Sequence, residues 1–236
     1  MTWSIVARDA SGAFGVAVAT RFFAVGALCP YARSGVGALA TQALINPLYA
    51  RGLDLLAEGV LPAEVINSLT KPDEGREQRQ LHMIDARGRI AAHTGSDCID
   101  WCGHLARDNF SVAGNMLVGP RVIEDSAGAY EKGSALSFAE RLIGALEAGE
   151  VAGGDKRGKQ SAALLIYTTE DYPALDLRID DHEDPLKELR RLHEKSLERY
   201  QPFVSCMASR ARPSGVFDRA VIEAEVTRFQ EARRRR

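Results

Sequence analysis

The second residue of the chain, Thr2, places a hydroxyl group directly after Met1 and directly ahead of a β-prone segment. An N-terminal threonine can act as a nucleophile that carries its own base, because a free α-amino group titrates at about pH 8 and can accept the hydroxyl proton. This chemistry requires removal of Met1, since a peptide nitrogen is not basic, and methionine aminopeptidase accepts a small second residue. The alternative is that Thr2 is a common second residue without a catalytic role.

Attack on an amide creates an oxyanion, which preorganised side-chain amides or backbone N–H groups stabilise. Asn115, at the end of a predicted strand, is the candidate oxyanion donor, and Gln42 and Asn46 are further candidates for the substrate site. The alternative for Asn115 is a polar residue that only ends a strand. Arg21, at the end of another predicted strand, is a candidate for lowering the pKa of the Thr2 amine or for binding a substrate carboxylate. Its alternative is an arginine that only contacts solvent.

The segment HTGSDCIDWCGH carries Cys98, Cys102 and His104, with His93 and Asp97 nearby, and so raises the question of a zinc site. The spacing C-x3-C-x-H is not a strong zinc pattern, and no second paired set occurs elsewhere. We therefore expect no metal, and interpret the segment as a loop that lines a pocket with His93 and Asp97. Cys98 lacks a base partner in the sequence that would make it a nucleophile.

The segment GGDKRGKQS has the glycines and positive charge of an anion-binding loop. It precedes a strand rather than a helix and lacks the P-loop order, so we expect no nucleotide and no other cofactor. The glycine pair allows a tight turn that directs Asp155, Arg157 and Ser161 across the sheet edges, with Arg157 and Ser161 as candidate substrate-binding residues. An intersubunit contact and plain surface charge are the alternatives.

The composition gives no electrostatic reason to expect nucleic acid. The 236 residues are 45% hydrophobic and 26% charged, with a net charge of −2. We expect a small-molecule substrate and assembly into a homo-oligomer, with no nucleic-acid or membrane partner. A run of about 18 apolar residues is absent, and so are the basic start and apolar core of a secretory signal. These features predict a cytoplasmic protein with reduced cysteines.

Hydrophobic periodicity predicts the order strands, two helices, strands, two helices, strands, helix. The expected strands lie at 3–8, 14–20, 35–44, 79–95 as a hairpin, 110–117, 161–169 and 174–180. The expected helices lie at 48–59, 62–71, 122–133, 136–149, 186–200 and 221–232.

This order excludes a doubly wound sheet, in which single strands and helices alternate. It favours an α+β protein built as a four-layer αββα sandwich of two antiparallel sheets, and an α+β fold with one sheet is the alternative. We expect residues 1–200 to form a single domain and residues 201–236 to form a C-terminal helical extension with a basic tail.

Six stretches of the chain carry a resemblance to the domain of unknown function 1028 family, which is similar to the N-terminal nucleophile (Ntn) hydrolase superfamily. They are TWSIVARDASGAFGVAVATRF (2–22), VGALATQALINPLYARGLDLL (36–56), HTGSDCIDWCGH (93–104), GNMLVGP (114–120), GGDKRGKQSAALL (153–165) and DLRIDDHEDPLKELRRL (176–192). Cys29 and Cys102 stand where the family pattern has other residues, which argues against either belonging to shared chemistry. Some relatives add a peptidoglycan-binding module, which suggests a peptidoglycan-related substrate.

The resemblance implies an Ntn-type sandwich that hydrolyses an amide or peptide-like bond in a small substrate. Thr2 would then be the nucleophile after Met1 removal, and Asn115 would stabilise the oxyanion. The alternative is a protein that retains this fold but only binds a ligand or assembles as a structural oligomer.

Overall fold

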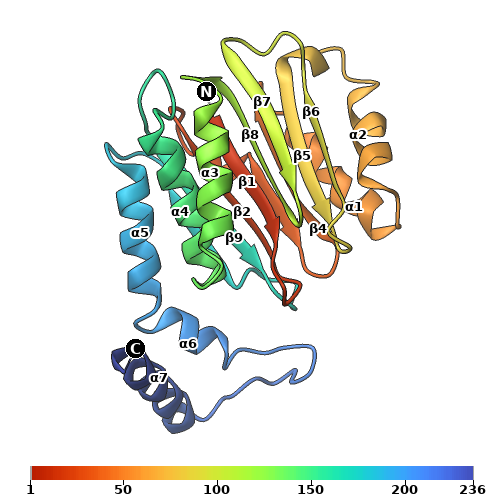
Figure 1. Cartoon of the computed structure of the whole chain (residues 1–236). Coiled ribbons are helices and arrows are strands. Elements are labelled where there is room, and N and C mark those ends of the chain that lie inside the picture. The colour runs from red at the N-terminus through yellow and green to blue at the C-terminus, as the bar shows by residue number, and fades with distance from the viewer. Residues whose placement is uncertain (1, 236) are drawn as a thin grey trace.

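The computed structural model describes residues 2–235, and within that range it contains two antiparallel sheets and seven α-helices. Figure 1 shows the sheets next to each other, with helices on the outer face of each. The predicted α+β class and the pair of antiparallel sheets are confirmed. Among the described residues, none of the helices has the length and apolar character that a membrane span requires.

The larger sheet places the first strand of the chain near its centre, in the order β10-β9-β2-β1-β8-β7. Its strands are β1 (Thr2–Arg8), β2 (Phe14–Thr20), β7 (Trp101–Arg107), β8 (Phe110–Leu117), β9 (Ser161–Tyr167) and β10 (Leu175–Ile179). The turn between β1 and β2 is fixed by Asp9, whose Oδ1 accepts hydrogen bonds from the backbone N–H groups of Ser11 (2.8 Å) and Ala13 (2.9 Å). Because β1 pairs with β2 on one side and β8 on the other, its backbone is hydrogen-bonded on both edges.

The smaller sheet has the order β3-β4-β5-β6. Its strands are β3 (Pro30–Arg33), β4 (Gly37–Ala43), β5 (Arg79–Asp85) and β6 (Ile90–Thr94), so the hairpin predicted over 79–95 is β5 with β6.

Helices cover the outer face of each sheet. The larger sheet is covered by α3 (Arg121–Lys132), α4 (Phe138–Val151) and α5 (Pro185–Ser196), and the smaller sheet by α1 (Gly52–Ala57) and α2 (Pro62–Thr70). The start of α4 is a capping box, in which Ser137 Oγ accepts from the N–H of Glu140 (3.3 Å) and the Glu140 carboxylate accepts from the N–H of Ser137 (3.0 Å). Trp3 and Leu142 belong to the cluster under α3, α4 and α5, and Leu81 to the cluster under α1 and α2.

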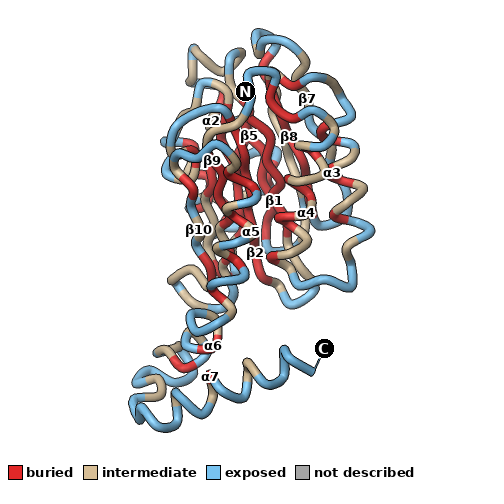
Figure 2. Tube along the Cα trace, turned by 90° about the vertical axis from the view of Figure 1, so that its left-hand side faces the viewer, coloured by how far each residue is buried: buried red, intermediate tan, exposed pale blue. Residues whose placement is uncertain are grey.

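The layer between the two sheets changes character along its length. At the end remote from Thr2 it is apolar, with Val16 and Val18 of β2 packed against Ala38 and Ala40 of β4. Toward the Thr2 end it is polar, and the buried residues there are Thr2, Ser4, Thr20, Gln42, Gln80, His82, Ser111 and Asn115. Figure 2 shows that the strands carry most of the buried residues and that exposed residues lie on the outside.

Two helices follow the sheets and their covering helices: α6 (Tyr200–Val204) and α7 (Arg219–Arg234), and α7 contains the predicted helix 221–232. Within α7, Val226 is the buried residue and most others are exposed (Figure 2). An ion pair of 2.9 Å between Arg233 and Glu194 links α7 to α5.

The sequence pattern does not predict β3 or β7. Residues 93–104 are expected to form a loop, but β7 begins within them at Trp101. Both strands lie at the edge of a sheet. An edge strand buries fewer side chains, and the residues of β7 are half-buried or exposed without a clean alternation. The predicted helix 48–59 is in fact a short 3-10 helix (η2, Pro47–Arg51) followed by α1.

Gly149 and Gly144 in α4 form a matched pair that tests how closely this helix approaches β1. A Cβ atom on Gly149 would lie 2.5 Å from Ser126 Oγ and 2.7 Å from Trp3 Nε1, whereas a Cβ on Gly144 meets nothing within 4 Å. We expect Gly149→Ala to lower the free energy of unfolding by about 1–3 kcal/mol because of overpacking. Gly144→Ala should raise it by about 0.5–1 kcal/mol through helix propensity. Denaturant titration measures both, and a stabilised Gly149→Ala variant would contradict the packing described.

Candidate active site

Thr2 opens β1 in the interior of the larger sheet, directly opposite Thr20 on β2 and Asn115 on β8. The three side chains are buried, with Thr2 5% exposed and Asn115 1% exposed. The hydroxyl oxygens of Thr2 and Thr20 lie 3.0 Å apart and share a hydrogen bond. Antiparallel register therefore brings together a hydroxyl from residue 2 and an amide from residue 115.

A cavity of about 570 Å³ opens at this end of the two sheets. Its polar lining residues are Thr2, Thr20, Gln78, Asp97, Asn115 and Arg157. Thr2, Thr20 and Asn115 are buried at its base, whereas Gln78, Asp97 and Arg157 are exposed. The rest of the lining is apolar apart from Cys98. An apolar pocket with a few convergent polar groups is the usual form of a small-molecule site.

Of the residues that the sequence singles out, Thr2, Asn115, Asp97 and Arg157 line this cavity. Arg21 and Ser161 lie beside it and contact its walls. Arg21 donates from Nη1 to the backbone oxygen of Arg157 (3.0 Å), and Ser161 Oγ donates to the backbone oxygen of Phe22 (2.5 Å). Both residues thus hold segments that form the cavity wall.

Gln42, Asn46 and His93 do not line the cavity among the described residues. Gln42 is buried between the sheets, below the cavity base. Asn46 caps η2, since its side chain accepts from the N–H of Leu48 (3.1 Å) and its Nδ2 donates to Asp73 (3.0 Å). The Nε2 of His93 donates to the backbone oxygen of Arg76 (2.9 Å). Each has a structural contact that accounts for its position.

A buried chain of hydrogen bonds runs from Asn115 into the layer between the sheets. The Nδ2 of Asn115 donates to Gln80 Oε1 (2.9 Å), and the Nε2 of Gln42 donates to the same oxygen (3.0 Å). Gln80 in turn donates from Nε2 to the backbone oxygen of Gly114 (2.8 Å). Ser4 Oγ donates to Gln42 Oε1 (2.7 Å), which ties β1 to β4. Gln80 therefore fixes the side-chain orientation of Asn115 without itself lining the cavity.

The chain of hydrogen bonds continues through Ser4 to His82 and Ser111, two residues that are not among the candidates predicted from the sequence. The Nε2 of His82 lies 2.9 Å from Ser4 Oγ and its Nδ1 lies 2.6 Å from Ser111 Oγ. Because Ser4 gives its only hydroxyl proton to Gln42, the consistent arrangement has Nε2–H donating to Ser4 and Ser111 donating to Nδ1. Burial lowers the pKa of His82 to about 3, with a smaller contribution from the charge of His104.

Gln80 and His82 leave one trace in the sequence. Over residues 80–83 of β5, Gln80 and His82 alternate with Leu81 and Met83, so the two polar residues share one face of the strand and the two apolar residues the other. That pattern is typical of a strand with one solvent-exposed face. Here the polar face lies against a second sheet, which only the tertiary structure reveals.

Backbone strain is concentrated around the cavity. Ala43 (φ 70°) and Met116 (φ 56°) line it, and Ala24 (φ 52°) and Asp100 (φ 58°) directly adjoin lining residues. Non-glycine residues rarely adopt this left-handed region, and such residues tend to cluster at functional sites. The strain at Met116 coincides with a register shift between Trp101 and Gly103 on the facing strand β7.

Cys98 lines the cavity and is the other candidate nucleophile there. Burial raises the pKa of its thiol to about 11, with a further contribution from Cys102. Because the thiolate is the reactive form, Cys98 is held in its unreactive state at neutral pH.

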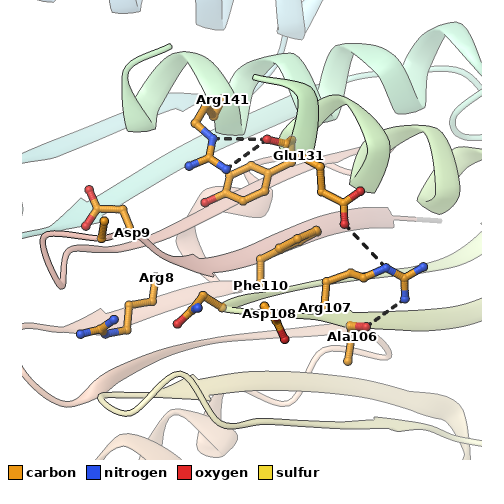
Figure 3. Close-up of a pocket in the computed structure, with 11 residues that line it drawn as sticks. Arg8, Asp9, Ala106, Arg107, Asp108, Phe110, Glu131 and Arg141 are labelled. Atoms are coloured by element: carbon orange, nitrogen blue, oxygen red, sulfur yellow. Dashed lines mark hydrogen bonds and ion pairs between the residues drawn. The ribbon is translucent and has the colours of Figure 1, made fainter. Parts of the chain in front are cut away.

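A second cavity, of about 630 Å³, lies at the opposite end of the larger sheet (Figure 3). Two of its arginines have partners: Arg107 pairs with Glu131 at 3.7 Å, and Arg141 lies 4.0 Å above the ring of Tyr130. Its described lining residues include no serine, threonine or cysteine. In the cavity at Thr2, by contrast, two threonine hydroxyls and the amide of Asn115 lie together.

Comparison with known proteins identifies the family. The model of a family of unknown function, DUF1028, matches residues 2–189, and the chain therefore belongs to this family. Protein SPO2555 from Silicibacter pomeroyi, a crystal structure assigned to the same family, is 32% identical with a TM-score of 0.85, over 92% of this chain and 99% of that chain. The Anbu (ancestral beta-subunit) from Yersinia bercovieri is 13% identical with a TM-score of 0.38, over 83% of this chain and 94% of that chain. No curated protein matches the chain.

His82 makes the stability of the protein sensitive to acid. The unfolded histidine takes up a proton below about pH 6.5, whereas the folded residue stays neutral until about pH 3. Above the unfolded pKa, His82 therefore makes its full contribution to the free energy of unfolding. This contribution is lost as the pH falls, and at pH 5 the free energy of unfolding is lower by about 2 kcal/mol. His82→Gln should flatten the slope of unfolding free energy against pH between these values. An unchanged slope in His82→Gln would contradict this account.

Ala43 tests the backbone strain at the cavity. Because glycine has no Cβ, Ala43→Gly should relieve the positive φ and raise the free energy of unfolding by about 1 kcal/mol. Ala57→Gly in the exposed part of α1 is the control and should lower it by up to about 1 kcal/mol. Thermal denaturation compares the two, and equal destabilisation of both variants would argue against strain at Ala43.

Proposed function

We propose that this chain is an amidohydrolase of the Ntn type, with an αββα sandwich and Thr2 as nucleophile after removal of Met1. The observation that carries the proposal is the placement of Thr2 and Asn115 as cross-strand neighbours at the base of one cavity. The resemblance of the sequence to Ntn hydrolases and the helix, sheet, sheet, helix arrangement support it.

In the proposed reaction, Thr2 Oγ1 attacks the carbonyl carbon of a small amide or peptide-like substrate. The hydroxyl proton passes to the free α-amine of Thr2, directly or through a water molecule. The developing oxyanion accepts a hydrogen bond from the Nδ2–H of Asn115 that is not donated to Gln80. The C–N bond then breaks, the departing amine takes the proton from the α-amine, and water hydrolyses the Thr2 ester. The scheme uses no metal or cofactor.

Thr20 and Gln80 have supporting roles in this scheme. The shared hydrogen bond with Thr20 orients the hydroxyl of Thr2, and Gln80 orients the amide of Asn115. Residues 1–200 are proposed as the catalytic domain and residues 201–236 as an extension with a basic tail. A homo-oligomer in the cytoplasm acting on a small molecule, including a peptidoglycan-related one, fits the same proposal.

Two changes at the N-terminus test the mechanism on a panel of small amides. Thr2→Ala removes the nucleophile and should lower kcat by at least about 10³-fold, while Cys98→Ala should retain most of the activity. Insertion of a lysine between Met1 and Thr2 keeps the Thr2 hydroxyl but blocks Met1 removal, and it should be equally inactive. Thermal denaturation confirms that each variant is folded.

Intact mass of the protein from its native host provides the deciding measurement. The proposal requires a population that begins at Thr2. Retention of Met1 in essentially all molecules would leave the alternative of a ligand-binding or structural oligomeric protein with this fold. Full activity of Thr2→Ala would instead mean that the nucleophile is another residue.

A further inference from the structure

The walls of the Thr2 cavity are formed by large apolar side chains that remain exposed to solvent. Phe22 is 51% exposed, Leu28 38%, Leu44 57% and Ile99 60%, and all four line the same cavity. Single exposed apolar residues are ordinary on protein surfaces, but several around one concave site indicate a place where an apolar group binds.

The charges at this cavity do not select a charged ligand. Its described lining contains one cation, Arg157, and one anion, Asp97. The guanidinium of Arg157 is already paired with Asp155 at 3.2 Å. The backbone N–H of Asp97 donates to Glu77 (2.7 Å), which places its exposed side chain at the rim. The walls therefore offer apolar surface without a net charge.

The walls and the base come from different parts of the fold. Thr2, Thr20 and Asn115 lie on paired strands, whereas Phe22, Leu44 and Ile99 lie on connections that follow β2, β4 and β6. Ala43, the last residue of β4, has a left-handed backbone where the chain enters the Leu44 connection. The N–H of Met116 in β8, also left-handed, donates to the backbone oxygen of Ile99 (3.2 Å). The apolar surface is thus held immediately beside the hydroxyl of Thr2.

We propose that the cavity binds the acyl part of an N-acyl amide whose acyl group is neutral and apolar. This inference rests on the proposed function, which puts the scissile carbonyl at Thr2 Oγ1. The acyl group stays attached to Thr2 after the amine departs, so walls beside Thr2 hold it through both steps. A volume of about 570 Å³ is within the range of about 300–1,000 Å³ that small-molecule sites occupy.

Binding to the full-length Thr2→Ala variant tests this proposal without turnover. Isothermal titration with acetyl, hexanoyl and decanoyl glycinamide should show affinity rising about fourfold for each buried methylene. A decanoyl analogue with a terminal carboxylate should bind at least about tenfold more weakly than decanoyl glycinamide, because its charge would enter an apolar site.

Variants of the walls locate the binding. Leu44→Asp and Ile99→Asp, both at exposed positions that tolerate a polar residue in the fold, should each weaken decanoyl glycinamide binding at least about tenfold. Leu136→Asp is the matched control, because Leu136 is 53% exposed and lies outside the cavity, and it should bind as the parent does.

Three results would overturn the proposal: equal affinity across the acyl series, unchanged binding in both wall variants, or equal weakening in the Leu136 control. Sedimentation of the wall variants provides a fourth result that would overturn the proposal. A change of oligomeric mass without a change of ligand affinity would assign the apolar surface to a contact with a second copy of this chain.

The outcomes distinguish the acyl-binding proposal from the proposed hydrolase function. Tight acyl binding without hydrolysis by the parent protein would refute only the proposed function, whereas Thr2-dependent hydrolysis of polar amides alone would refute only the apolar specificity.

Discussion

The buried hydrogen-bond chain that begins at Asn115 is the interaction on which the cavity depends. Gln80 accepts from Asn115 and Gln42 and donates to Gly114, so one side chain of the smaller sheet fixes both a side chain and the backbone of the larger. In a water-excluded layer, each group left without a partner costs about 1–3 kcal/mol. Loss of one member therefore affects the others, and the two sheets keep one relative register at this end.

The need to pair every buried polar group explains why the layer between the sheets has an apolar end and a polar end. Val16, Val18 and Ala40 supply apolar contact at the remote end, which stabilises the pair of sheets without specifying side-chain orientation. Hydrogen bonds at the other end specify orientation, because donors and acceptors match only in one arrangement. A cavity with a polar base can open at that end without leaving unpaired groups under it.

The base of the cavity and its walls differ in how firmly the fold holds them. The candidate reacting groups lie on strands with partners on both edges, where the backbone has little freedom. Phe22, Leu44 and Ile99 of the apolar walls lie on connections, and Ala43 and Met116 at the ends of the neighbouring strands have a strained backbone. Substitutions in those connections would change the walls of the cavity without changing the strands that hold its base at Thr2.

The sequence by itself determined the α+β class, the hairpin after Thr2, the paired helices and the family, because alternation, capping and turn residues act locally. It also pointed to Thr2 and Asn115 by their chemistry. It did not predict the edge strands β3 and β7, whose periodicity is weak because they bury little. Only the tertiary structure decided that Thr2 and Asn115 are neighbours, that Gln80 and His82 lie between sheets, and that His93 and Asn46 lie outside the cavity. The physical reason is that strand register and sheet packing join residues far apart in the chain, which no local pattern encodes.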